Sequence, residues 1–457
     1  MDTHVRSHEA YKLMHEGTLA LTRAEQQGIR VDLVYIEKKQ AYLTAKIEHL
    51  EKKFKLSKFY AHWEHSVKGR VNINSNNQLA YFLYNVKKIT PEKLTITGKG
   101  STDDEALQML NIEELNILLE MRKLRKVRDT YLVAFQREQV NGYIHPFFNL
   151  HIVKTYRSSS DRPNFQNIPK RDEESMNIVR QALYPRPGHQ LVEIDFSGME
   201  VRVNCCYNKD PNLIHYMTNK SADMHADMAA QIFMLDPFDK KLPDHYVLRQ
   251  ATKNGFVFPQ FYGDYYKNCA VNMACSWGKL PHGDWSPGQG IPLNGKYLSD
   301  HLISKGIKSL NSFINHIKVI EREFWDKKFP DYATWKDRWW SVYQKYGYID
   351  LLTGFRCSGV MARNEAINTP AQGTGFHCLL WCFNELDRIM IQEKWDTRII
   401  GQIHDSIILD VKPNELDYVI EMGKQVTMID LPEHWKWINV PMEIDIDIFE
   451  VDSCWIK

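Results

Sequence analysis

The stretch "GQIHDSIILD", residues 401–410, decides the fold that we expect for this chain. It is rich in β-branched residues, which is typical of a strand, but His404, Asp405 and Ser406 interrupt the apolar pattern. A charged side chain is rarely buried unless it is paired with another charge or binds a metal ion. The position of Asp405 in a strand-like segment therefore indicates a charged partner, a bound metal ion or another function.

A second apolar segment, "HQLVEIDFSG" at 189–198, also reads as a strand and ends near Asp195. If the two strands are neighbours, the carboxylates of Asp195 and Asp405 converge and repel each other unless a cation lies between them. Mg²⁺ suits such a pair, because it prefers oxygen ligands and commonly binds one or two carboxylates together with substrate phosphates. Two unrelated surface or capping aspartates are the alternative that these residues alone leave open.

The composition describes a large chain without a signal for membranes or disulfides. With 457 residues, 43% of them apolar, and a net charge of +1, we expect two or three subdomains. No apolar run is long enough to span a bilayer, and the eight cysteines are scattered, which predicts a reduced, intracellular protein. A zinc site at Cys269, Cys275 and His282 is a minor alternative, because the spacing does not fit a standard zinc knuckle.

Although the net charge of the chain is only +1, the segment "EMRKLRKVRD" at 120–129 is strongly basic. Apolar residues recur at helical spacing along it, at Ile117, Met121, Leu124, Val127, Tyr131 and Phe135. The basic side chains, Arg122 and Lys126 among them, lie largely outside this stripe. A solvated helix face is the plainer interpretation, and a helix that follows a phosphate backbone is the alternative.

The wider pattern predicts a mixed sheet with helical insertions before it and between its strands. We expect helices at 8–30, 33–56, 111–140, 223–262, 299–346 and 362–394, and strands at 189–198, 399–411 and 440–451. A Gly- and Pro-rich loop covers 278–295.

Five motifs follow one another along the chain. They are "TYRSSSDRPNFQNIPKR" (155–171), "EIDFSGMEVR" (193–202), "RQATKNGFVFPQFYG" (249–263), "NEAINTPAQGT" (364–374) and "QIHDS" (402–406). In this order and spacing they resemble the family A DNA polymerases, the family of bacterial DNA polymerase I and related phage replicases. The segment "ALTRAEQQGIRVD" (20–32) is also similar to the family, and the resemblance spans nearly the whole chain.

The resemblance implies an α+β right-hand fold, with an antiparallel palm sheet and mostly helical thumb and fingers. It divides the chain into an N-terminal helix that packs on the palm (1–30), a thumb (31–145), a first palm part (146–222), fingers with the 278–295 loop (223–363) and a second palm part (364–457). The implied reaction is template-directed addition of deoxynucleoside monophosphates to a primer 3′-hydroxyl with two Mg²⁺ ions, which Mn²⁺ can replace, and with release of pyrophosphate.

The catalytic and metal-binding positions are implied in the same way. The family's metal ligands match Asp195, Asp405 and the carbonyl oxygen of Phe196. The cations that would hold the triphosphate match Arg249 and Lys253, which share a helix face because they are four residues apart.

Further nucleotide contacts match Glu200, His225, Phe258 and Tyr262. Glu200 matches the family's steric gate, where a bulky acid beside the sugar excludes a 2′-hydroxyl. Its plainer interpretation is an acid that is favoured at a helix N-terminus. His225 matches the histidine near the triphosphate, and the aromatic residues match positions that stack on base and sugar.

The motif at 249–263 departs from the family, since it has one residue more than usual between Lys253 and Tyr262 and contains a proline. We expect a bulge or kink that returns Arg249, Lys253, Phe258 and Tyr262 to one face. Counting back from Tyr262 assigns the sugar-sensing position to Phe258, whereas counting forward from Lys253 would assign it to Val257, and we favour Phe258.

Other polar residues match the family's primer and template contacts. These are Arg157, Asn164, Gln166, Asn167, Arg171, Asn368, Gln372 and His404, and on the basic helix Arg122 and Lys126. Donors at such positions can sense the minor-groove acceptors that all correct base pairs share. Ordinary loop and cap hydrogen bonding is the alternative.

Two departures keep rival interpretations open. Ser406 stands where the family often has Glu, and Gly198 stands where it often has Gln. Ser406 also fits the single-subunit RNA polymerases, which share the palm, whereas Glu200 and the 155–171 loop favour DNA synthesis. A non-catalytic DNA-binding replication factor is the second rival, and the retained aspartates argue against it.

We expect a monomer whose partners are primer–template DNA and dNTPs, without a membrane. Because the chain begins almost at the thumb, we expect no intrinsic 3′–5′ proofreading, and a separate exonuclease or processivity factor is a further partner that the sequence leaves open. The expected location is the cytoplasm of a bacterium or of a virus-infected cell, with an organelle as the alternative. Replication, repair and translesion synthesis all fit.

Overall fold

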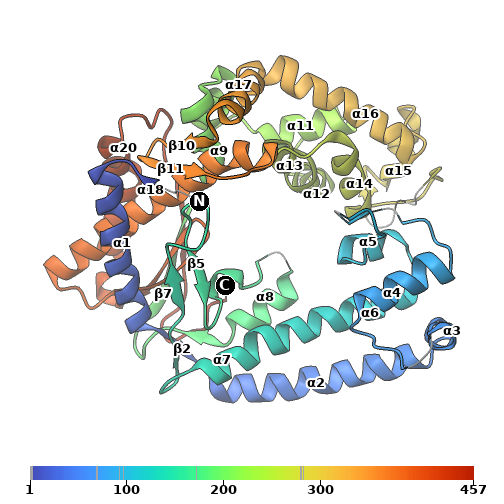
Figure 1. Ribbon diagram of the computed structural model, residues 1–457, viewed down its shortest axis with the longest axis horizontal. Helices are drawn as coiled ribbons and strands as arrows, with labels where there is room; N and C mark the ends of the chain where they lie inside the picture. The colour runs from blue at the N-terminus through green and yellow to red at the C-terminus, as the bar shows by residue number, and fades with distance from the viewer. Residues whose placement is uncertain are drawn as a thin grey trace. The chain divides into compact units, whose positions relative to one another are not determined.

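The chain forms two compact units. The computed structural model describes residues 4–67, 70–91, 93–95, 97–170, 172–277, 280 and 283–456. The first unit consists of Met1–Val31, Glu138–Ile168 and Leu183–Lys457, and the second of Asp32–Arg137 and Pro169–Ala182 (Figure 1). The strand pairs in the described part are antiparallel and helices dominate, which confirms the α+β class. The expected division into thumb, palm and fingers stays a prediction.

A four-stranded antiparallel sheet lies at the centre of the first unit. Its order is β12 (Arg398–Ile403), β13 (Ser406–Val411), β7 (Gln190–Phe196) and β14 (Ile444–Ile448). Nearly every residue of β7 and β13 is buried, because helices and strands cover both faces. The two segments that contain Asp195 and Asp405 are therefore neighbours.

The expectation of one strand over 399–411 is wrong. The chain turns back at His404 and Asp405, so that β12 and β13 form a hairpin in which Ile403 pairs with Ser406. His404 has φ 51°, in the left-handed region. A strand cannot continue through a residue in this conformation, so the polar residues mark a turn and not a break in burial.

Two long helices support this sheet. Helix α1 (His8–Gln27) lies beside α18 (Arg363–Glu393) in Figure 1. The helices approach closely at Gly17, where a Cβ atom would lie 2.8 Å from a methyl carbon of Leu380. The helix expected over 8–30 ends at Gln27, because Gly28 takes φ 67° and β2 begins at Ile29.

The helices that follow β7 in the chain share a hydrophobic core that contains Phe256, Trp277 and Phe313, all fully buried. The helix expected over 223–262 is interrupted at 234–242. The elements are α9 (Met199–Asn208), α10 (Pro211–Thr218), α11 (Met224–Phe233), α12 (Pro243–Thr252), η4 (Lys253–Val257), α13 (Phe258–Phe261), α14 (Tyr266–Ser276), α15 (Leu298–Ser304), α16 (Leu310–Glu323), η5 (Phe324–Lys328) and α17 (Pro330–Tyr346).

Smaller elements complete the first unit. The strands are β1 (His4–Val5), β10 (Tyr348–Asp350), β11 (Phe355–Ser358), β2 (Ile29–Val31), β3 (Tyr143–Ile144), β6 (Leu183–Tyr184), β4 (Phe147–Asn149), β5 (Ser159–Asp161), β8 (Pro292–Leu293) and β9 (Lys296–Tyr297). The helices are η3 (Phe165–Asn167), η6 (Pro413–Glu415), α19 (Leu416–Lys424), η7 (Gln425–Asp430) and α20 (Leu431–His434). No helix in the described part of the chain is both long enough and apolar enough to cross a membrane.

The second unit is helical, and α2 (Leu33–Lys55) packs along α6 (Glu113–Arg125) (Figure 1). Met121, Leu124 and Val127 of the predicted apolar stripe are buried, which confirms the stripe. The remaining elements are α3 (Lys58–Ser66), α4 (Asn76–Ala80), η1 (Tyr81–Val86), α5 (Asp104–Met109), η2 (Lys126–Leu132), α7 (Val133–Glu138) and α8 (Glu173–Arg180).

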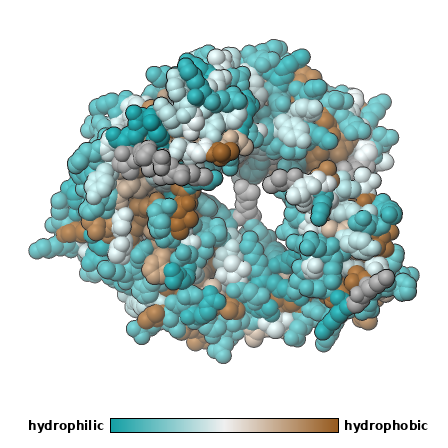
Figure 2. Space-filling model, viewed as in Figure 1, coloured by the Kyte–Doolittle hydropathy of each residue, from teal (hydrophilic) through white to brown (hydrophobic). Residues whose placement is uncertain are grey.

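Hydrophilic residues cover most of the face shown in Figure 2, with hydrophobic residues in separate patches.

Candidate active site

The carboxylate end of the site lies where β7 meets the β12–β13 turn. Asp195, next to last in β7, pairs in register with Ser406 of β13 and with Asp445 of β14. The backbone N–H of Phe196 donates to the carbonyl oxygen of Asp405 over 3.0 Å. The sheet thus makes the segments that carry Asp195 and Asp405 neighbours, which is the condition under which their carboxylates were expected to converge.

The turn that carries Asp405 is fixed by its neighbours. The hydroxyl of Ser406 donates to the carbonyl of Ile403 over 2.9 Å, and the amide of Gln402 donates to the carbonyl of His404. Ser406 is buried, so the small residue that stands where the family often has Glu closes the turn and adds no charge to the site. Asp405 itself is partly exposed.

Sequence analysis missed Arg202, which holds the chain in place just after Asp195. Gly198 has φ 64°, which lets the chain pass from β7 directly into α9. The guanidinium of Arg202 then donates to the carbonyl oxygens of Ser197 (2.8 Å) and Pro441 (2.5 Å) and pairs with Glu443. An arginine between two valines, Val201 and Val203, at the end of the motif at 193–202 was the signal that could have found it.

These groups fit a divalent cation that also takes oxygen ligands from a substrate. Asp195, Asp405 and the Phe196 carbonyl offer hard oxygen donors, the type that Mg²⁺ prefers. Among the described residues no group of three or more His, Cys, Asp or Glu side chains is arranged to hold a metal ion. Arg157, whose Nη2 lies 3.8 Å from Asp405 Oδ1, partly balances the charge of this end.

The predicted zinc alternative lies largely outside the described residues. His282 is not among them, and the side chain of Cys275 is not described either. Burial raises the pKa of Cys269 to about 12, so its thiol stays protonated at neutral pH.

The cation end of the site lies on α12. Arg249, in the last turn of this helix, donates through Nε to both carboxylate oxygens of Asp223, at 3.1 and 3.0 Å. Lys240 binds the same carboxylate at 2.9 Å. Asp223 was not among the predicted site residues, and its position just before His225 was the signal that could have found it.

The extra residue in the 249–263 motif is absorbed by a π-helical turn. Segment η4 spans Lys253–Val257, and the N–H of Phe258 donates to the carbonyl of Lys253, five residues back. The Lys253 ammonium lies 5.3 Å from the centre of the Phe258 ring, whereas Val257 is fully buried. The expected bulge is present, and Phe258, not Val257, lies against Lys253.

His225 closes this end from α11. Its ring meets that of Phe258 edge to face, with centroids 5.6 Å apart. Burial, with Arg249 and Lys253 nearby, lowers the pKa of His225 to about 4, so the ring is neutral at pH 7. Its Nδ1 is buried and has no hydrogen-bond partner among the described residues.

Glu200 and Tyr262 connect the two ends. Arg157 Nη1 lies 3.4 Å from Glu200 Oε1, and Glu200 Oε2 is buried without a hydrogen-bond partner among the described residues. Burial raises the pKa of Tyr262, and the carboxylates of Glu200 and Asp405 add to the shift. The Tyr262 ring lies 6.5 Å from that of Phe258. One surface therefore runs from the carboxylates to the cations.

Two of the predicted primer and template residues, Gln166 and Asn368, form hydrogen bonds near these groups. Gln166 donates to Ser158 (2.7 Å) and Gln402 (2.5 Å), which anchors η3 beside β12. Asn368 of α18 donates to the carbonyl of Tyr262 over 2.8 Å.

Other predicted contacts lie in loops, at a helix end or elsewhere on α18. Asn164 caps η3, Gln372 is partly buried on α18, and Asn167 and His404 are exposed. Arg171 lies outside the described residues.

The two predicted DNA contacts of the second unit differ in environment. Arg122 donates to the carbonyl of Thr102 (2.9 Å) and to the side chain of Asn76 (2.7 Å), so it ties helices together. Lys126 is exposed. Within this unit, Lys126 is therefore the better placed of the two to meet a phosphate.

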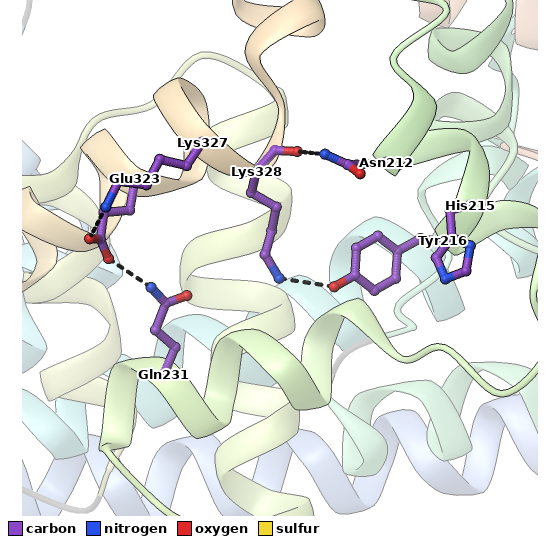
Figure 3. Close-up of a pocket in the computed structure, with 7 residues that line it drawn as sticks. All are labelled: Asn212, His215, Tyr216, Gln231, Glu323, Lys327 and Lys328. Carbon is purple, nitrogen blue, oxygen red and sulfur yellow. Dashed lines mark hydrogen bonds and ion pairs between the residues drawn. The ribbon is translucent and has the colours of Figure 1, made fainter.

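A separate cavity of about 480 Å³ lies among α10, α11 and η5. Figure 3 shows Lys327 beside Glu323 and Lys328 beside Tyr216, with Nζ–Oε1 and Nζ–Oη distances of 2.9 Å each. Its lining consists of Asn212, His215, Tyr216, Gln231, Glu323, Lys327 and Lys328. None of these residues belongs to the strands or the turn that carry the carboxylates.

Known proteins are similar to this chain along nearly its full length. The sequence model of DNA polymerase family A matches residues 35–277, more than half of the chain. DNA polymerase I of Geobacillus stearothermophilus is 26% identical over 442 residues, covering 93% of this chain and 44% of that protein. The thermostable DNA polymerase I of Thermus filiformis is 28% identical over 449 residues, covering 94% and 46%. The chain thus spans about half the length of these relatives.

Among solved structures, the POL domain of Pol1 from M. smegmatis, in complex with DNA primer-template and dNTP, has a similar fold. Its TM-score is 0.73 at 22% identity, and the match covers 97% of this chain and 70% of that one. This likeness confirms the expected polymerase fold.

Proposed function

The chain belongs to DNA polymerase family A, and from this premise we propose that it adds deoxynucleoside monophosphates to a primer 3′-hydroxyl as a DNA template directs, releasing pyrophosphate. The observation that carries the proposal is the single surface on which paired carboxylates lie at one end and paired cations at the other. Nucleotidyl transfer needs both, because negative charge develops on the attacking and on the leaving oxygen.

Asp195, Asp405 and the carbonyl of Phe196 would hold two Mg²⁺ ions, for which Mn²⁺ is the expected substitute. Bound there, the ions supply electrostatic stabilisation of the attacking and leaving oxygens. The sheet supports this role. The backbone hydrogen bond from the N–H of Phe196 to the carbonyl oxygen of Asp405 fixes the spacing of the two segments before any substrate binds.

The triphosphate would lie against Arg249, Lys253 and His225. The two cations neutralise phosphate charge, while the neutral imidazole offers a hydrogen bond without adding charge. A cation that is already in place reduces the reorganisation needed in the transition state.

Sugar selection would fall to Glu200, Phe258 and Tyr262. The Arg157 guanidinium near Glu200 holds this carboxylate beside Tyr262, where it would meet a 2′-hydroxyl. The bulk of this acid beside the sugar would leave no room for a 2′-hydroxyl, which favours deoxynucleotides.

Primer–template DNA is the proposed partner. Arg157, Gln166, Asn368, Gln372 and His404 would contact the primer terminus and the new pair from the first unit. Asn164, Asn167 and Arg171 would add contacts from the loop at 155–171, and Arg122 and Lys126 would contribute from the second.

A primer-extension assay with matched dNTP and rNTP panels tests the proposal. We expect template-dependent extension with dNTPs that requires a divalent cation and drops with rNTPs. Preferential extension with rNTPs would support the RNA polymerase alternative that Ser406 leaves open, and binding of DNA without extension would support a non-catalytic replication factor. Shortening of a mismatched 3′ end by the same pure chain would overturn the expectation that it lacks proofreading.

A further inference from the structure

Three charged side chains form a cluster beside the proposed triphosphate site. Asp223 lies at the start of α11, Arg249 in the last turn of α12, and Lys240 in the segment between these helices. The carboxylate of Asp223 is 12% exposed, the guanidinium side chain of Arg249 20% and Lys240 54%. We call these three residues the Asp223 cluster.

The hydrogen bonds from Arg249 to Asp223 use only one of the three guanidinium nitrogens. Both short contacts use Nε of Arg249, at 3.1 and 3.0 Å from the carboxylate oxygens. The two terminal amino groups, which form the fork that binds phosphate, take no part in these bonds. Asp223 therefore fixes the plane of the guanidinium from the side and restricts a long, flexible side chain before a nucleotide binds.

A carboxylate at this place has an electrostatic cost, since it repels an incoming triphosphate. Lys240 lies 2.9 Å from Asp223 and offsets this charge. Burial would raise the pKa of Asp223, but the hydrogen bonds from Arg249 and Lys240 lower it to about 2, so the carboxylate is charged at neutral pH. With two cations and one anion, the cluster keeps one net positive charge toward the nucleotide.

Asp223 also caps α11, the helix that carries His225. Its carboxylate accepts a hydrogen bond from the N–H of Ala226 over 3.0 Å. Asn is an equally good N-cap residue, so Asp223→Asn removes the charge and keeps the cap. The positioning role can thus be separated from the structural one.

We propose that Asp223 is a positioning residue that orients Arg249 for the triphosphate, and that Lys240 adds the charge that makes this arrangement compatible with an anionic substrate. The inference rests on the proposed function and deepens it, because it assigns two residues outside the family motifs to the same nucleotide site. Arg249 contacts the nucleotide, whereas Asp223 acts through it.

Single-turnover incorporation of one dNTP separates the two roles, since it yields a maximal rate and an apparent Kd for the nucleotide. Asp223→Asn should lower the maximal rate about tenfold while the apparent Kd stays the same or falls, because orientation is lost and a repulsive charge is removed. Lys240→Gln should raise the apparent Kd about fivefold at low salt with little change in rate. The double variant should recover an apparent Kd close to wild type, because the cluster again has one net positive charge, and should stay slow.

Asp227→Asn is the matched control. Asp227 lies one turn further along α11 and accepts a 2.6 Å hydrogen bond from Tyr216, at the edge of the cavity in Figure 3. This control variant should keep both constants within about twofold of wild type, because its carboxylate contacts no cation of the nucleotide site.

Three results would overturn the inference. Asp223→Asn could match Asp227→Asn in both constants, or the double variant could show the Kd losses added instead of cancelled. Lys240 is exposed, so Lys240→Gln does not endanger folding, and an unchanged apparent Kd for it also refutes the inference. If the wild-type chain extends no primer, the proposed function itself is wrong, which is a different outcome.

Discussion

The two ends of the candidate site are built on different kinds of backbone. At the carboxylate end, Asp195 and Asp405 are placed by strand register and by a two-residue turn. At the cation end, Arg249 and Phe258 lie on helices joined by the π-helical turn Lys253–Val257. Both ends present their side chains to one surface. Only the helical end contains one residue more than the corresponding family motif.

This difference shows where the site tolerates a change of length. Side chains alternate along a strand, so a shift of one residue turns every following side chain to the opposite face. A helix can take up one extra residue as a π-helical turn while the turns on either side keep their faces. We therefore expect that the carboxylate end does not tolerate insertion or deletion of a residue and that the cation end does.

The largest expected effect is loss of a carboxylate. Asp195→Asn or Asp405→Asn should reduce primer extension by at least about 10³-fold, because charge on the reacting oxygens loses its stabilisation. Single-turnover incorporation with Mg²⁺ measures the loss. Asp445→Asn is the control, since Asp445 also pairs with Asp195 but is exposed on β14, and it should stay within about threefold of wild type. Equal losses in all three variants would contradict the assignment.

Single-residue deletions test the contrast directly. Deletion of the exposed Asn254 should convert η4 into an ordinary helical turn, leave Phe258 on the face of Arg249, and keep extension within about tenfold of wild type. Deletion of Ile407 from β13 should abolish at least about 99% of the extension and lower the melting temperature, since the register against β7 shifts. If the helical deletion were the more harmful of the two, the comparison between the ends would be wrong.

A smaller effect is expected at the sugar. Phe258→Tyr places a hydroxyl near the proposed 3′ position and should raise dideoxynucleotide use about tenfold relative to the matching dNTP. Competition between the two nucleotides in one extension reaction measures the ratio. Extension with dNTPs alone is the internal control and should change little. An unchanged ratio would remove the assignment of Phe258.

The smallest effect concerns stability at acid pH. Burial, with the nearby cations Arg249 and Lys253, lowers the pKa of His225 from 6.5 to about 4, so the unfolded chain takes up a proton over a pH range where the folded chain does not. The wild type should therefore lose about 2 kcal/mol relative to His225→Gln as the pH falls from 6.5 to 4. Parallel denaturant titrations of both proteins check this, and parallel stability curves would contradict it.

Much of the site could be predicted from local sequence. The apolar runs around Asp195 and Asp405 predicted strands, and the four-residue spacing of Arg249 and Lys253 predicted a shared helix face. The count between Lys253 and Tyr262 predicted a bulge, because a helix with a fixed period cannot otherwise keep both residues on one side. Each of these depends on neighbours in the chain.

Other features depend on contacts between distant segments and escaped prediction. One strand was expected over 399–411, because a turn of His404 and Asp405 lacks the usual Gly or Asn signal. Arg202 and Asp223 were missed, because their partners, Glu443 and Arg249, are 241 and 26 residues away.

Local sequence was enough to predict most of the helices and strands, most of the charged residues of the site and the family to which the chain belongs. Contacts between distant segments were needed to show that Asp405 lies in a turn against Phe196 and that Arg249 donates to Asp223 through Nε. The physical reason is that periodicity and spacing act along the chain, whereas the partner of a buried or charged group is chosen by packing across it.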